Sequence, residues 1–149
     1  MAERVLPTVR ILLPCDSANY DLADQKWMLK NPWGTLQLPP GANFPFRVKD
    51  MWVYTQFVDG LGAFDLAVEL LRIADDGSRK SIGTSAATRI EFPTGERLLA
   101  RDSAFRLKRV PFRQAGLFEF RAVAATEGGS EILTGQSAEL RVLDRRTRL

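Results

Sequence analysis

The chain of 149 residues contains no histidine and a single cysteine, Cys15. Without imidazole, the Ser-His-Asp and Cys-His arrangements of nucleophilic catalysis are excluded, and so are zinc sites built on histidine. One cysteine forms neither an intramolecular disulfide nor a thiolate cluster, so the fold does not depend on oxidation. Because these absences remove most common catalytic and metal-binding chemistry, we expect no metal, no cofactor and no enzymatic activity.

Long apolar runs and targeting signals are also missing. No segment approaches the roughly 20 consecutive apolar residues that span a bilayer, and no secretory hydrophobic core precedes Asp16. We therefore expect a cytoplasmic protein without a membrane span. A phosphate-binding Gly-x-x-x-x-Gly-Lys-Ser/Thr loop is absent, and the Gly60-Leu61-Gly62 segment lacks the third glycine of a dinucleotide-binding fingerprint.

The residues that are present have the balance of an ordinary globular domain. Hydrophobic residues make up 45% and charged residues 26%, with a net charge of +3. A chain of this length fits one domain with its own core, so residues 1–149 are predicted to form a single domain. Many nucleic-acid-binding domains are more basic, and we expect no nucleic-acid partner.

The last third of the chain alternates apolar and charged residues. In residues 117–124 four side chains share one face: Phe118, Phe120, Ala122 and Ala124. Glu119 and Arg121 point the other way. A period of two, bounded by turns at residues 114–116 and 127–129, is typical of antiparallel strands with one buried and one solvated face.

Strand-like runs precede this region: residues 8–13, 35–38, 49–58, 64–73, 81–92 and 97–110. We expect Pro14 to end the first run, residues 16–24 to be rich in turns, and residues 26–30 to form a strand or one helical turn. The run 49–58 is apolar on both faces and is predicted to be central, with Trp52 in the core. Residues 64–73 also fit a helical stripe, but the tight turns on either side favour a strand.

About eight or nine strands separated by turn signals favour an all-β fold, a single-domain antiparallel β-sandwich of immunoglobulin-like or jelly-roll-like type. A barrel is the runner-up. The irregular, proline-rich residues 39–45 are predicted to form a surface loop, and residues 144–149 a charged tail.

Four segments together form a pattern that extends over most of the chain. They are residues 10–16, the segment around Trp27, residues 57–60 leading into 64–70, and residues 116–123. In this layout the chain resembles a small, functionally uncharacterised family of bacterial β-sandwich proteins, from which it departs around residues 39–45. The resemblance implies the fold and carries no active residues.

Two sets of residues are candidate surface contacts. Trp33 is the tryptophan most expected to be exposed, and tryptophan is favoured in protein interfaces. Arg106, Lys108, Arg113 and Arg121 form a basic stretch that suits phosphates or an acidic protein surface. Alternation also explains these charges as the solvated face of a sheet, which is the simpler interpretation.

Other reactive groups have simpler explanations. Aspartates near predicted turns could bind Ca²⁺, but the Asp75-Asp76-Gly77 segment is accounted for by hairpin-turn chemistry. Cys15 lies beside Asp16 and is expected to be a small buried hydrophobe rather than a nucleophile.

These observations lead to two functional hypotheses. The first is a non-enzymatic structural or assembly protein that acts through contacts with a protein partner or with itself. The alternative is a ligand-binding β-sandwich module for carbohydrate or an acidic polymer. An enzyme that uses only aspartate or glutamate is the least favoured.

Overall fold

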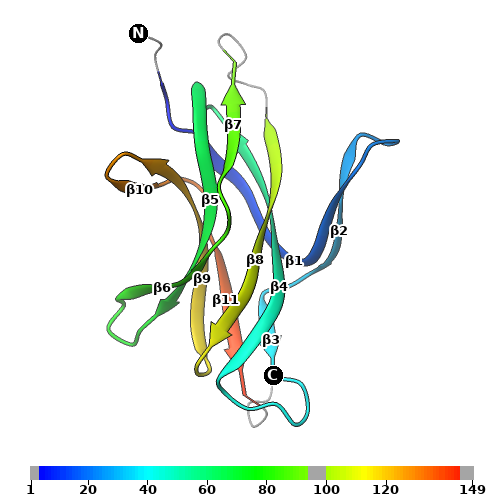
Figure 1. Cartoon of the computed structure of the whole chain (residues 1–149), viewed down its shortest axis with the longest axis vertical. Helices are drawn as coiled ribbons and strands as arrows, with labels where there is room; N and C mark the ends of the chain where they lie inside the picture. Colours follow the sequence, from blue (N-terminus) through cyan, green and yellow to red (C-terminus); the bar gives the residue numbers. More distant parts are fainter. Residues whose placement is uncertain (1–3, 94–99, 145–149) are drawn as a thin grey trace.

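The computed structural model describes residues 4–93 and 100–144, which form eleven β-strands and no helix (Figure 1). Within these ranges there is accordingly no helix that could cross a membrane. The strands are β1 (Thr8–Asp21), β2 (Lys26–Pro32), β3 (Thr35–Gln37), β4 (Phe46–Val58), β5 (Gly62–Ile73), β6 (Arg79–Thr84), β7 (Thr88–Phe92), β8 (Arg101–Phe112), β9 (Gly116–Thr126), β10 (Gly129–Ile132) and β11 (Ala138–Leu143).

The strands form two sheets, which confirms the predicted β-sandwich, with more strands than expected. One sheet has the order β2-β1-β4-β8. The other has the order β3-β11-β9-β5-β6, with β7 also paired to β5 and β10 to β9. This places β1, β4 and β8 in one layer and β5, β9 and β11 in the other, as strands A, B, E and C, F, G are divided in immunoglobulin-like sandwiches.

The core lies between the two sheets and consists of the alternate side chains that the sequence pattern assigned to it. Phe118 and Phe120 are buried on β9, facing Phe105 and Phe112 of the opposite sheet's strand β8. The rings of Phe112 and Phe118 meet edge to face, with centroids 5.1 Å apart, a favoured arrangement for aromatic pairs. Strand β4 lies between β1 and β8, as expected for a run that is apolar on both faces.

Strand β1 does not end at Pro14 but continues to Asp21, so the predicted stop is wrong. The Pro14 carbonyl accepts a hydrogen bond from the Trp33 amide at 3.0 Å, on the side of β2. The amide hydrogen that proline lacks would point to that same side, where pairing with β2 is just beginning. The ladder between β1 and β4 therefore loses no donor at Pro14.

The run 81–92 forms two strands rather than one. Strands β6 and β7 pair in succession with β5, and the chain leaves the ladder between them at Ser85. There the Ser85 hydroxyl accepts a hydrogen bond from the Val68 amide at 2.9 Å and takes over a ladder position. Strand β5 is confirmed as a strand, and it buries apolar side chains on both faces, with Ala67 and Leu71 buried on the second face.

The sandwich was predicted to be antiparallel, but one of its strand pairs is parallel. Strand β3 pairs in parallel with β11, with Thr35 opposite Arg141 and Gln37 opposite Leu143. This pairing follows from the path of the chain, because β3 comes directly after β2 and crosses from one sheet to the edge of the other. The predicted loop at residues 39–45 lies between β3 and β4 and contains no strand. Of the predicted tail, residues 145–149 lie outside the described part of the chain.

Candidate functional site

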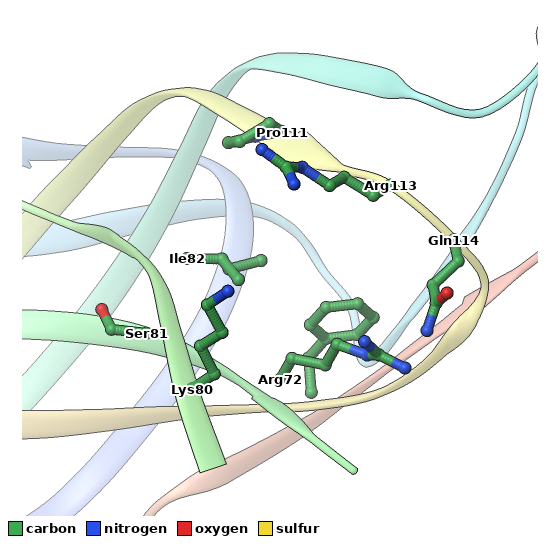
Figure 2. A pocket seen from close by; sticks show the side chains of 8 residues that line it. Arg72, Lys80, Ser81, Ile82, Pro111, Arg113 and Gln114 are labelled. Carbon is green, nitrogen blue, oxygen red and sulfur yellow. The ribbon is translucent and has the colours of Figure 1, made fainter.

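A pocket of about 330 Å³ opens at one end of the sandwich, where β5 and β6 of one sheet face the end of β8 in the other (Figure 2). Its walls are formed by eight residues: Arg72, Lys80, Ser81, Ile82, Pro111, Arg113, Gln114 and Phe118. In Figure 2, Arg113 and Pro111 lie on one wall, with Lys80 and Ile82 across from them.

The inner end of the pocket is apolar because it borders the core. Phe118 is 2% exposed, and Ile82 packs against the core cluster. Gly83 lies beside it on β6, where a Cβ atom would be 3.6 Å from Cγ2 of Val110 on β8. A Cβ atom at Gly83 would therefore make an ordinary van der Waals contact with the opposite sheet, which lies directly behind the pocket.

The mouth of the pocket is cationic because two basic residues take positions on the inward face of their strands. Arg72 follows Leu70 by two residues on β5, and it lies opposite Phe118 on β9. On its other side, Arg72 lies directly opposite Lys80 of β6. Inward positions of a sandwich are normally apolar, so two opposed cations there are a departure from the pattern of the whole fold.

No carboxylate lines this pocket, and none of Arg72, Lys80 and Arg113 has an ion-pair partner among the described residues. The Gln114 side-chain amide lies against the Arg72 guanidinium. With its oxygen turned toward the cation, it accepts hydrogen bonds from Nη2, Nε and Nη1 of Arg72. This neutral acceptor orients the guanidinium and leaves its charge uncompensated.

The structure brings only one of the predicted basic residues, Arg113, into this pocket. Arg106 lies on the outer face of β8, where it forms an ion pair of 2.6 Å with Asp50 and lies over the Trp52 ring. Lys108 is exposed on the same strand, opposite Asp50.

Arg121 lies on β9 in the other sheet and pairs with Glu69 at 2.9 Å. The basic stretch is therefore divided among separate surfaces, and its members do not form one groove.

The predicted aromatic contacts are also placed differently. Trp33 is half-buried rather than exposed, since its ring packs against the core. Its Nε1 is buried without a hydrogen-bond partner in the described ranges. Trp52 was predicted in the core but is half-buried on the outer face of β4, because the core side of that strand is taken by Met51, Val53 and Phe57.

A second notable surface is a hairpin, here called the arm, made of residues 15–32. The first half of β1 pairs with β4 as far as Cys15, and the second half pairs only with β2. In Figure 1 this hairpin projects from the body of the sandwich. It carries three of the four exposed large hydrophobic residues of the described chain: Tyr20, Leu22 and Met28, which are 47%, 82% and 51% exposed.

Aromatic contacts hold the end of the arm nearest its turn against the outer face of the sheet. The Trp27 ring lies between Tyr20 and Tyr54, with centroid distances of 5.6 and 6.0 Å. Tyr54 also donates a 2.7 Å hydrogen bond to Asp102, and burial together with this bond raises the pKa of its hydroxyl. A cleft of about 550 Å³ lies between arm and sheet, lined by these aromatics and Asp102.

The remaining reactive groups form no catalytic or metal-binding arrangement in the part of the chain described. No group of three or more cysteine, aspartate or glutamate side chains is close enough to hold a metal ion there. Cys15 is fully buried, as predicted, and burial raises the pKa of its thiol. Asp76 caps its own hairpin turn by accepting hydrogen bonds from the Ser78 amide and hydroxyl, which confirms that segment as a turn.

Sequence reasoning missed Arg72, Lys80 and Gln114. Arg72 could have been found from the sequence, because a basic residue there continues the apolar face of a strand. The position of Lys80 could not, because it depends on a register shift between β5 and β6. No protein-family model matches the chain, and no curated protein matches it. The resemblance to a bacterial β-sandwich family therefore remains a prediction.

Proposed function

We propose that this chain is a non-enzymatic structural or assembly protein that contacts another protein through the arm. The observation that carries the proposal is the gathering of exposed apolar side chains on the arm, where Leu22 is 82% exposed at the tip. Tyr20 packs on Trp27, and Met28, opposite Asn19, faces the other way, so Leu22 and Met28 are the apolar side chains of the arm that favour burial against a partner. Burying a leucine side chain fully contributes about 1.5–3 kcal/mol, so Leu22 would be a favourable anchor for a partner.

The occupant that fits the arm is a protein with an apolar groove. Strand β2 is the outermost strand of its sheet, so its outer edge has backbone groups that are available for pairing. A partner strand along that edge would supply hydrogen bonds, while the groove would receive Leu22 and Met28. Lys26 and Lys30 on the same strand disfavour pairing of two identical edges, since like charges would then face each other. We therefore favour a different protein over a second copy.

Site-specific photo-crosslinking in the source cell tests this proposal. A photoreactive amino acid at Leu22 is expected to give an adduct of defined mass, and the same group at Lys49, which is exposed on β4, is expected to give none. Met28→Ser should weaken the adduct without lowering the melting temperature, because Met28 is exposed. Adducts at multiples of the chain's own mass would identify a second copy as the partner. A monomer in light scattering that forms no adduct from Leu22 would overturn the proposal.

Carbohydrate binding is a second candidate, supported by the aromatic cleft between arm and sheet. Tyr20, Trp27 and Tyr54 line it together with Asp102, and aromatic rings with a few polar groups are typical of ligand sites. A glycan array separates the two candidates. Glycan binding that is lost in Trp27→Ala, with crosslinking from Leu22 unaffected, would support the second. An array without signal would remove it.

A further inference from the structure

The cationic pocket contains a charge arrangement that the fold does not need. Arg72 and Lys80 lie directly opposite each other on neighbouring strands and on the same face. Like charges in this position destabilise a sheet, and Arg113 adds a third cation from the opposite wall. By contrast, two other cations on sheet faces are matched by carboxylates: Arg106 pairs with Asp50, and Arg121 pairs with Glu69.

No carboxylate is among the described residues that line the pocket. The nearest carboxylate on the neighbouring strand is Glu119, which lies opposite Leu71 and pairs with Arg79 at 3.3 Å. Arg79 directly precedes Lys80, and Glu119 directly follows Phe118. Because Lys80 and Phe118 face inward and side chains alternate along a strand, Arg79 and Glu119 lie on the outer face of the sheet. The uncompensated charge is therefore confined to the inward side, where the pocket is.

The size and walls of the pocket narrow the class of ligand. Its volume of about 330 Å³ falls within the roughly 300–1,000 Å³ of sites for small organic ligands, which is more room than a bare inorganic anion needs. Phe118, Ile82 and Pro111 provide apolar surface beside the cations. Ligand sites commonly combine such a wall with a few charged groups that orient the ligand.

We propose that this pocket binds a small organic anion whose acidic group pairs with Arg72, Lys80 and Arg113 and whose apolar body lies against Phe118 and Ile82. Gln114 holds the Arg72 guanidinium in place by accepting from its three nitrogens, and the second N–H of each Nη remains as a donor for an acid. This site lies between the two sheets, none of the arm residues 15–32 lines it, and it does not depend on the function proposed for the arm.

Titration of the isotope-labelled protein with three probes, followed by amide chemical shifts, tests this site. The probes are 3-phenylpropionate, which has an acid and an apolar body, 3-phenylpropanol, which lacks the acid, and inorganic phosphate, which lacks the body. We expect 3-phenylpropionate to shift the amides of Lys80, Ile82 and Phe118 in a saturable way, and the other two to bind at least tenfold more weakly.

Two variants that each remove one positive charge distinguish binding in the pocket from an effect of the protein's net charge. Arg72→Gln is expected to weaken 3-phenylpropionate binding by about tenfold, since a hydrogen bond to a charged group is lost. Arg141→Gln is the control, because Arg141 is exposed on β11 and faces away from the core side taken by Leu140 and Val142. It should leave the affinity within about twofold, because solvent and salt screen distant surface charges.

Several results would overturn the proposal. Equal affinity for the acid and the alcohol would make the pocket a purely apolar cavity. Equal weakening by Arg72→Gln and Arg141→Gln would reduce the effect to net charge, and shifts away from Lys80, Ile82 and Phe118 would place the anion elsewhere. Lys80→Gln keeps the test valid if Arg72→Gln fails to fold, because Lys80 is exposed and its substitution should not disturb the fold. We expect Lys80→Gln to weaken 3-phenylpropionate binding by about threefold.

Discussion

Two ion pairs on strand β5 differ mainly in their exposure, and this difference predicts how much each stabilises the fold. Glu69 lies directly opposite Arg121 of β9, and Asp65 lies directly opposite Arg89 of β7. Each pair therefore joins β5 to a neighbouring strand. The side chains of Arg121 and Glu69 are only 22% and 16% exposed. Those of Arg89 and Asp65 are 64% and 49% exposed.

The geometry of the two pairs sets the expected magnitudes. Arg121 donates from Nε to one carboxylate oxygen of Glu69 at 3.0 Å, and its Nη2 lies 2.9 Å from the same oxygen. Hydrogen bonds to charged groups contribute about 1.5–3 kcal/mol when solvent is largely excluded. Because this pair is only partly buried, we expect a coupling energy near the lower end, about 1.5 kcal/mol. The Arg89–Asp65 pair is 3.6 Å apart and solvated, so its coupling should be below about 0.5 kcal/mol.

Two double-mutant cycles measured by urea unfolding test these values. One cycle combines Glu69→Ala with Arg121→Ala, and the other combines Asp65→Ala with Arg89→Ala. Raising the salt concentration should reduce the second coupling much more than the first, since buried pairs are screened less. Equal couplings in the two cycles, or a Glu69–Arg121 coupling below about 0.5 kcal/mol, would refute the reasoning and make Arg121 available again as a binding residue.

Three further predictions concern single positions. Gly135→Ala should lower the free energy of unfolding by about 2 kcal/mol or more, because the φ of Gly135 is +106° and a Cβ atom there would overlap the backbone of β1. Gly128→Ala is the control, because a Cβ atom at Gly128 would meet nothing within 4 Å; in thermal unfolding it should change the free energy by less than about 0.5 kcal/mol. Burial and the hydrogen bond to Asp102 raise the pKa of Tyr54. The neutral phenol therefore stabilises the fold fully at a pH below 10.0, the ordinary pKa of tyrosine, and this stabilisation is progressively lost as the pH rises above that value. Tyr54→Phe should therefore lack this alkaline loss of stability and the most alkaline step of tyrosinate absorbance. Lys80→Gln should raise the free energy of unfolding slightly, by less than about 0.5 kcal/mol and less at high salt, because it removes one of two opposed cations; a decrease would contradict the repulsion inferred at that position.

Much of the fold was predictable because local pattern and burial agree. The alternation around Phe118 and Phe120 identified the core face of β9, and the two apolar faces of residues 49–58 identified a central strand. The prediction failed at Pro14, where the consequence of a missing amide depends on which neighbouring strand that amide would face. It also failed at the β6–β7 break, where Ser85 replaces a ladder hydrogen bond with a side-chain bond that no local pattern announces.

The candidate site was much less predictable than the fold. Arg113 was named as one member of a basic stretch, yet its pocket partners come from β5 and β6, more than thirty residues earlier in the chain. Two other members of that stretch, Arg106 and Arg121, each pair with a carboxylate on a neighbouring strand, Asp50 and Glu69 respectively. Charge along the sequence therefore indicated that cations were present, and strand pairing decided which of them remain uncompensated.

The sequence by itself determined the fold class and the limits on chemistry. A period of two between turns admits few structures other than antiparallel sheets, and a chain without histidine cannot build an imidazole site whatever its fold. Only the tertiary structure decided where Arg72, Lys80 and Arg113 meet and where the arm leaves the sandwich. The physical reason is that register and sheet packing are non-local: a bulge between β5 and β6 sets which side chain faces inward, and the approach of the two sheets sets what lies across from it.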